Sequence, residues 1–312
     1  MVEATTSTLD GPHGPSLGAR VAARQLSQRR AAYILLAPLL IFFGVSVLYP
    51  VFETIRLSFF EIKGLAPPKP VGLGNYVKLW NDENFLRALR VTFYWSFSAT
   101  FFSVAIGWAL AMACALKPKE TMIFRVLIFA AYGVSEAVVG FIWLGIYRPD
   151  YGLLNGILGG LGLEHLQQAW LGNPATALTA VIVAYVWTQV GLPLMTCFAS
   201  IQSIPRSYFE AAYIDGAKPI SMMRHIVMPL SLPGVRVAIF INLLQSLKAF
   251  DLIYMLTGGG PVRTTETVGF FMFRESMLNF KLGYGAASTV VLLVAVLIVS
   301  TPLIAQRTRA VK

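Results

Sequence analysis

The sequence predicts an all-α integral membrane protein with six transmembrane helices and a short cytoplasmic helix between two of them. Of the 312 residues, 56% are hydrophobic and 13% are charged, and the mean hydropathy is +0.66. This composition is too apolar for a soluble protein of such length. A transmembrane helix needs about 20 consecutive apolar residues, and the chain contains several such runs almost free of charge.

Six apolar segments are expected to cross the membrane. They are residues 31–52, 91–116, 123–147, 175–201, 226–250 and 282–305. Together they make a transmembrane domain at residues 31–305. Residues 1–30 lack hydrophobic periodicity and are expected to form a disordered tail, and residues 306–312 form a second tail.

The basic residues predict the orientation of the spans. Lys and Arg are more frequent on one side of the expected spans than on the other. The richer side comprises the two tails, the connection between the second and third spans, and the polar segment after the fourth span. Cytoplasmic loops carry such an excess. Because the number of spans is even, both termini are expected in the cytoplasm. The net charge of +10 needs no nucleic-acid partner, since basic residues ordinarily flank spans.

A polar segment between the fourth and fifth spans predicts a short helix at residues 207–218. Ser207 and Glu210 have the spacing of a capping box, and Gly216 is suited to a helix end. Ala211 and Ala212 keep the preceding surface shallow. A shallow surface of small residues suits docking by another protein.

The motifs of several enzyme classes and metal sites are absent. No GxxxxGK[ST] phosphate loop and no HExxH motif occurs, and His13, His165 and His225 lack metal-ligand spacing. The segment Gly258–Pro261 is expected to be a tight extracellular turn, because no lysine or helix start follows it as a phosphate site requires. Cys114 and Cys197 fall inside expected spans and are interpreted as buried small hydrophobic residues.

Polar residues inside the spans are the candidates for a substrate path, because such residues are costly in hydrocarbon. Three expected helices carry pairs spaced by four residues, with Gln245 beside the third. The pairs are Tyr132 and Glu136, Tyr185 and Gln189, and Asn242 and Ser246. Hydroxyls, amides and aromatic rings are the groups that bind a sugar. The alternative is that they only bond neighbouring helices together.

The polar segment also carries an ordered motif. Glu210-Ala211-Ala212 is followed after three residues by Gly216, and after nine more by Ile226 and Met228-Pro229. This pattern resembles the EAA motif of permease subunits of binding-protein-dependent ABC importers, with Met228 where that motif has leucine. Further matches at Ser203-Ile204-Pro205, residues 71–76 and Thr257–Pro261 resemble the carbohydrate-uptake branch, over roughly residues 31–305.

The resemblance implies a type I ABC importer permease fold and a set of partners. The Gly-Gly-Pro loop after the fifth span is typical of the MalF-like half, so a second, MalG-like permease is implied. Two ATPase subunits that use ATP and Mg, and an extracytoplasmic substrate-binding protein, complete the machine in a bacterial or archaeal cell (inner) membrane. The short helix becomes the coupling helix, whose implied ATPase contacts are Glu210, Ala211, Ala212, Asp215 and Gly216. No cofactor is expected in this chain.

One position departs from the family. Where related permeases usually have a Pro-Tyr stretch and a proline, this chain has Ala131–Glu136. An acidic residue at membrane level demands a partner or water. We expect Glu136 either to pair with Arg236 or Lys248 or to contact the substrate.

The resemblance implies a transporter that moves a di- or oligosaccharide, with ATP hydrolysis in another subunit. Glycerol-3-phosphate or a related polyol phosphate is the alternative cargo. A different class, a membrane-embedded transferase acting on lipid-linked sugars, would use Glu136, Asp150 and Asp251 as acids, but no clustered carboxylate pair is apparent in the sequence. A self-contained secondary transporter would need an internal repeat, and none is evident.

Overall fold

The chain divides into two compact units, residues 1–54 and residues 55–312, and each is described by itself. The computed structural model describes Tyr33 and residues 35–309, so the tail expected at residues 1–30 lies outside the described residues. A helix covers Leu35–Ser58, passing through the π-helical segment η1 (Gly44–Leu48) into α2 (Tyr49–Ser58), whose last four residues belong to the second unit. This helix is apolar and long enough to cross a membrane.

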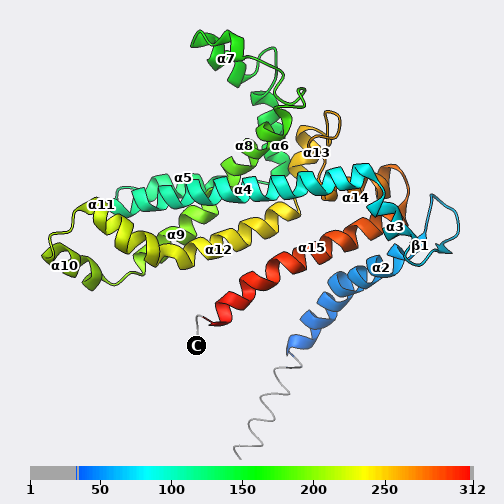
Figure 1. Cartoon of the computed structure of the whole chain (residues 1–312), viewed down its shortest axis with the longest axis horizontal. Coiled ribbons are helices and arrows are strands. Elements are labelled where there is room, and N and C mark those ends of the chain that lie inside the picture. The colour runs from blue at the N-terminus through cyan, green and yellow to red at the C-terminus, as the bar shows by residue number, and fades with distance from the viewer. Residues whose placement is uncertain (1–32, 34, 310–312) are drawn as a thin grey trace, which may run out of the picture. The chain divides into compact units, whose positions relative to one another are not determined.

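Three long helices form the frame of the second unit (Figure 1). They are α4 (Glu83–Leu116), α12 (Met228–Leu247) and α15 (Leu282–Arg309). The short α11 (Pro219–Met222) and the π-helical η3 (Met223–Val227) lead into α12 without a break. Helix α4 starts before the expected residue 91 because the Asp82 carboxylate caps it, accepting a hydrogen bond from the Asn84 backbone N–H at 2.9 Å.

Two of the expected spans are broken. Helices α5 (Met122–Tyr132) and α6 (Glu136–Ile146) meet at 100°, and α8 (Ala177–Gln189) and α9 (Gly191–Gln202) meet at 44°. Pro193 explains the second bend, because a proline in the first turn cannot bond the carbonyl four residues earlier and clashes with it. Among the described residues, four helices are long and apolar enough to cross a membrane, or six if each bent pair is one span.

The remaining elements are short. They are α3 (Gly74–Trp80), α7 (Leu153–Gly160), η2 (Glu164–Leu166), α10 (Arg206–Ile214), α13 (Asp251–Leu256), α14 (Val268–Phe273) and the π-helical η4 (Arg274–Leu278). The strands β1 (Phe60–Glu61) and β2 (Lys69–Pro70) pair antiparallel, with Phe60 opposite Pro70. The prediction of an all-α membrane protein is therefore confirmed, apart from this two-residue ladder.

Close helix contacts build the core of the second unit. Trp95 of α4 and Tyr185 of α8 are fully buried, and their ring centroids are 5.0 Å apart. Helix α9 packs against both α4 and α12. At Gly234 of α12, a Cβ atom would lie 2.6 Å from the Ser200 Cβ of α9, so only glycine permits this approach. Small residues at such contacts are how helices associate where the hydrophobic effect no longer drives them together.

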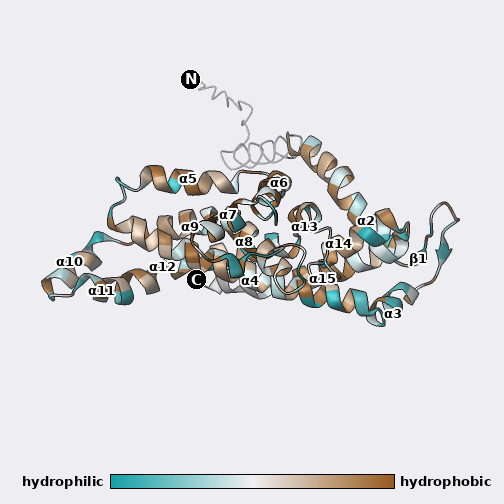
Figure 2. Ribbon diagram, turned by 90° about the horizontal axis from the view of Figure 1, so that it is seen from above, coloured by the Kyte–Doolittle hydropathy of each residue, from teal (hydrophilic) through white to brown (hydrophobic). Residues whose placement is uncertain are grey.

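The polar elements of the second unit gather at its two ends (Figure 2). Hydrophilic residues lie on α3 and around β1 at one end and on α11 beside α10 at the other, with apolar helices between them. Cys114 and Cys197 are both free and buried, which confirms their interpretation as small core residues.

Candidate functional site

The expected docking helix is α10, and its start differs from the prediction. The helix begins at Arg206, directly after Pro205, and no side chain caps it. Ser207 and Glu210 therefore do not form a capping box. Pro205, with φ −59° and ψ 138°, fixes the chain direction before the helix, so the first turn is already helical when it reaches Ser207.

Helix α10 ends at Ile214, four residues before the expected residue 218, and the predicted glycine, Gly216, lies just after this end. Gly216 has a φ of +71°, in the left-handed region that glycine enters at little cost. The Gly216 N–H donates to the Tyr213 carbonyl at 3.0 Å, and the Ala217 N–H donates to the Ala212 carbonyl at 2.9 Å. These two bonds make a Schellman motif, which satisfies the last carbonyls of the helix.

One face of α10 is anchored and the other is free to meet a partner. Phe209 packs against a buried cluster formed by α4, α9 and α12. Of the expected contact residues, Ala212 is half-buried, and Glu210, Ala211, Asp215 and Gly216 are exposed. The helix brings these five residues together on a short surface segment.

Three large apolar residues, which were not predicted as contact residues, also lie on this surface. Tyr213 is 80% exposed, Ile214 84% and Ile220 82%. Exposed apolar residues that adjoin one another mark interaction surfaces. The signal was present in the sequence, because these three apolar residues stand within a polar segment.

The candidate substrate path centres on two helix breaks that meet. Helix α5 ends at Tyr132 and α12 ends at Leu247, and the Gln245 side-chain amide donates to the Tyr132 hydroxyl at 2.8 Å. Tyr132 and Glu136 were expected on one face of a continuous helix. That expectation is wrong, because the 100° break separates them.

The other candidate residues lie on α8 and α12, and their bonding is incomplete. Asn242 and Ser246 bond mainly carbonyls of their own helix, at 3.0 Å each. Three buried side-chain oxygens make no hydrogen bond within the described part of the chain. They are the Tyr185 hydroxyl and the side-chain amide oxygens of Gln189 and Asn242. Pure helix-to-helix bonding would satisfy these atoms, so part of this set has unused bonding capacity.

One of the two roles expected for Glu136, an ion pair with Arg236 or Lys248, is not found among the described residues. None of the ion pairs among the described residues includes Glu136, and Arg236 and Lys248 are both exposed. Glu136 instead stands at the first position of α6 and is half-buried. Lys248 is the residue that directly follows the end of α12.

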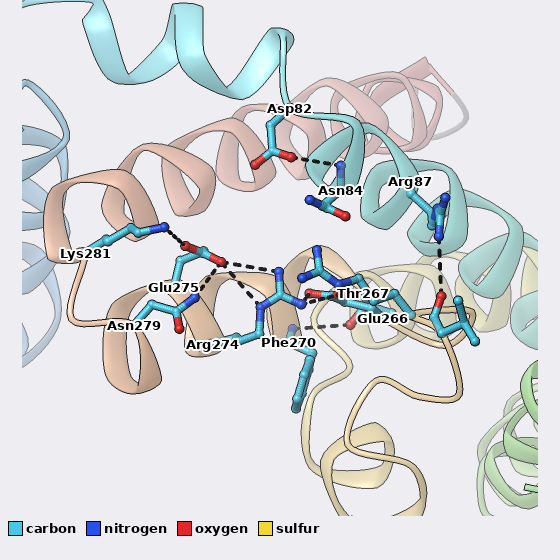
Figure 3. A network of polar contacts seen from close by, with 12 residues as sticks. Asp82, Asn84, Arg87, Glu266, Thr267, Phe270, Arg274, Glu275, Asn279 and Lys281 are labelled. Carbon is cyan, nitrogen blue, oxygen red and sulfur yellow. Dashed lines mark hydrogen bonds and ion pairs between the residues drawn. The ribbon is translucent and has the colours of Figure 1, made fainter. Parts of the chain in front are cut away.

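At the opposite end from α10, a polar network holds the loop after α13 (Figure 3). Glu266 is buried and forms an ion pair with Arg274, which also contacts Glu275 at 3.3 Å. Burial raises the pKa of Glu266, and the positive charge of Arg274 partly opposes this rise. Lys281 reaches Glu275 at 3.1 Å. The network therefore fixes the chain on both sides of α14.

The loop itself forms the predicted tight turn at Gly258–Pro261. Gly258 and Gly259 have φ values of +56° and +79°, and the Gly260 N–H donates to the Thr257 carbonyl at 3.0 Å. The hydroxyls of Thr257 and Thr265 lie 2.7 Å apart and close the loop. No group of His, Cys, Asp and Glu side chains that could hold a metal ion occurs among the described residues.

Several known proteins are similar to this chain in sequence, and others in fold. Residues 103–309 match the family described as "Binding-protein-dependent transport system inner membrane component". The probable ABC transporter permease protein YurN of Bacillus subtilis is 34% identical over 86% of this chain and 92% of its own length. The trehalose/maltose transport system permease protein MalF of Thermococcus litoralis is 31% identical over 88% and 91%.

A solved structure supports the architecture. The bacterial ABC transporter involved in import of the acidic polysaccharide alginate contains a chain that superposes with a TM-score of 0.81, at 20% identity, over 93% of this chain and 99% of that one. The type I importer permease fold is thereby confirmed, and the transferase alternative is set aside because the relatives are permeases. The chain belongs to the inner-membrane permease family of binding-protein-dependent ABC transport systems.

Proposed function

We propose that this chain is the MalF-like permease subunit of an importer that moves a di- or oligosaccharide across the cell membrane. The observation that carries the proposal is α10, a short helix anchored by Phe209, ended by a Schellman motif and exposed on its other side. Its sequence is the motif that this family places against an ATPase. The relative that transports trehalose and maltose supports a sugar as cargo.

The proposed machine has four kinds of subunit. This chain pairs with a MalG-like permease, two ATPases bind ATP and Mg, and an extracytoplasmic protein delivers the sugar. Both termini lie in the cytoplasm of a bacterial or archaeal cell, on the same side as α10. Glu210, Ala211, Ala212, Asp215 and Gly216 contact the ATPase, together with the exposed Tyr213, Ile214 and Ile220.

Movement of the ATPases is transmitted through the anchor of α10. Because Phe209 joins α10 to the cluster that includes α4, α9 and α12, a pull on α10 reaches the long helices directly. A rigid lever of this kind can tilt a helix bundle between inward-facing and outward-facing states. The sugar then meets the unused bonding groups of Tyr185, Gln189 and Asn242, with Tyr132, Gln245, Ser246 and Glu136 beside them.

The geometry does not favour the alternative phosphate-bearing cargo. The break between α5 and α6 carries an acidic side chain, Glu136, at the start of α6, and an acidic group does not attract a phosphate. The stretch that resembles glycerol-3-phosphate permeases, residues 202–207, leads into α10 and lies away from this break.

Purification of the intact complex in detergent tests the proposal. A phosphate-loop ATPase and a second permease should copurify with this chain, and the reconstituted complex should import a radiolabelled disaccharide delivered by its binding protein only when ATP is present. A chain that transports sugar by itself, or that purifies with neither subunit, would contradict the assignment.

A further inference from the structure

The segment between α6 and α8 has a polar interior. We call residues 147–172 the α7 segment. The buried Asn155 side-chain amide donates to the carbonyls of Pro149 at 3.0 Å and Gln168 at 3.1 Å, and the Trp170 indole N–H donates to the Asn155 side-chain oxygen at 2.8 Å. These bonds tie both ends of the segment to α7. Its central polar groups are therefore bonded within the segment.

The outer face of α7 is apolar. Leu153, Ile157 and Leu161 follow one another at intervals of four residues, which places them on one side of the helix, and all three are exposed. In Figure 1, α7 stands apart from the long helices of the second unit. Glu164 and His165 of the following η2 are exposed as well. Apolar and charged groups exposed side by side suit the level where lipid meets water.

Aromatic rings at the end of α6 indicate the same level. The ring centroids of Trp143 and Tyr147 are 5.1 Å apart, and those of Trp143 and Trp187 are 6.1 Å apart. Trp and Tyr are frequent at membrane surfaces, because their rings are apolar and their N–H and O–H groups are polar. The end of α6 is therefore expected at a membrane surface, with Arg148 two residues beyond the helix.

A cavity of about 520 Å³ lies at this end of α6. Its walls are mainly apolar and include Phe141 and Leu144 of α6 and Leu171 of the α7 segment. Arg148 is the one charged residue among those that line it. Phe141 and Tyr151, which also line it, are exposed. The cavity is therefore open to the surroundings of the chain.

The charge of Arg148 is not neutralised within the described part of the chain. None of the ion pairs there includes Arg148 or Asp150, and Asp150 does not line the cavity. The Arg148 guanidinium lies over the Tyr151 ring, 4.8 Å from its centroid. A guanidinium can stack on a ring with its flat face and bind an anion through the N–H groups at its edge. Arg148 therefore provides a cation for an anionic ligand.

We propose that this cavity binds one anionic phospholipid, with an acyl chain against Phe141, Leu144 and Leu171 and the phosphate bonded to Arg148. The apolar walls match a hydrocarbon chain, and an arginine can bind a phosphate through two parallel hydrogen bonds. A sugar or a free phosphate would match only one of these features. Lipid is favoured over the partner permease because the membrane itself supplies phosphate groups at the ends of its spans. The inference goes beyond the proposed function and does not depend on the cargo.

Photocrosslinking in nanodiscs tests the site. The sample is the assembled importer in a background of phosphatidylcholine. The probes are phosphatidylglycerol and phosphatidylcholine that carry the same photoreactive group at the same position of the acyl chain. Mass spectrometry after proteolysis measures the lipid attached to residues 141–172. We expect phosphatidylglycerol to label these residues about fivefold more than phosphatidylcholine, the ratio that one basic residue near a membrane surface gives.

Three variants assign the labelling to the cavity. Arg148→Gln should bring the ratio of the two lipids close to one. Arg90→Gln is the matched control, because Arg90 is exposed near the start of α4 and does not line the cavity, and it should leave the ratio unchanged. Gly145 lines the cavity, and a Cβ there would meet nothing within 4 Å. Gly145→Leu should therefore fill the cavity and reduce labelling by both lipids.

Several outcomes would overturn the proposal. Equal labelling by the two lipids in the wild type, or a preference that persists in Arg148→Gln, would refute the phosphate contact. Labelling that Gly145→Leu leaves unchanged would refute the acyl position. If neither lipid labels residues 141–172, the partner permease or another group covers this face. Copurification of the ATPase and sugar import are measured on the same preparation, so each of these results leaves the proposed function standing.

Discussion

The left-handed residue at the end of α10 allows a sharp test of how the docking helix works. A Cβ atom at Gly216 would meet nothing within 4 Å in this chain, so added bulk alone does not disturb the fold. The φ of +71° is the constraint. Left-handed backbone costs roughly 1–2 kcal/mol for an ordinary residue, more for a β-branched one, and much less for asparagine.

Gly216→Val and Gly216→Asn are therefore a matched pair of similar size. Valine should open the Schellman motif and loosen the last turn of α10, whereas asparagine should keep both. A cost of about 1–2 kcal/mol corresponds to a factor of roughly 5–30. If only the closed helix docks, the affinity for the ATPase falls by up to that factor in the valine variant.

Titration of the purified ATPase onto the permease pair measures this dissociation constant. The asparagine variant should bind within about twofold of wild type, well below the factor expected for valine. Equal weakening by the two residues would show that bulk at the contact matters and the backbone does not. Unchanged binding in both variants would remove Gly216 from the docking mechanism altogether.

Three further perturbations follow from the described contacts. Glu210→Lys reverses an exposed charge on α10 and should weaken ATPase copurification while membrane insertion stays normal; undiminished copurification would contradict the contact. Asp82→Ala removes both the α4 cap and the 2.7 Å bond from the Tyr284 hydroxyl, and should cost about 1–3 kcal/mol in thermal unfolding, with Tyr284→Phe costing less. Burial raises the pKa of Asp82, but the hydrogen bonds from Tyr284 and Asn84 lower it more, so the net pKa is below its ordinary value. The Asp82 contribution is thus present above the ordinary pKa of about 4 and is lost as the pH falls through the lowered value, and a stability profile independent of acid would refute it. Arg274→Met leaves the buried Glu266 without its main partner and should lower the free energy of unfolding by about 3–5 kcal/mol. Glu266→Gln in the same chain should restore part of this loss. A double variant less stable than the single one would argue against an ion-pair origin.

The local sequence was sufficient to predict the features that depend only on neighbouring residues. The long apolar runs predicted helices because a bilayer leaves the backbone no other way to satisfy its polar groups. Gly216 predicted the end of α10, because few other residues reach the left-handed region. The prediction of a capping box was wrong because Pro205, and not Ser207, is the residue that precedes the first turn of α10. The substrate path and the ATPase contact stay predictions, since both depend on chains that bind to this one.

The amino-acid sequence by itself determined the class of the protein, an apolar helical permease with a docking motif, because composition, run length and residue spacing are properties of the chain alone. The tertiary structure decided where the spans break and which groups those breaks bring together. Helix periodicity placed Tyr132 and Glu136 on one face, yet the bend after Tyr132 separates them, and the end of α12 brings the Gln245 amide to the Tyr132 hydroxyl instead. Such pairings arise from packing between distant helices, which no local pattern encodes.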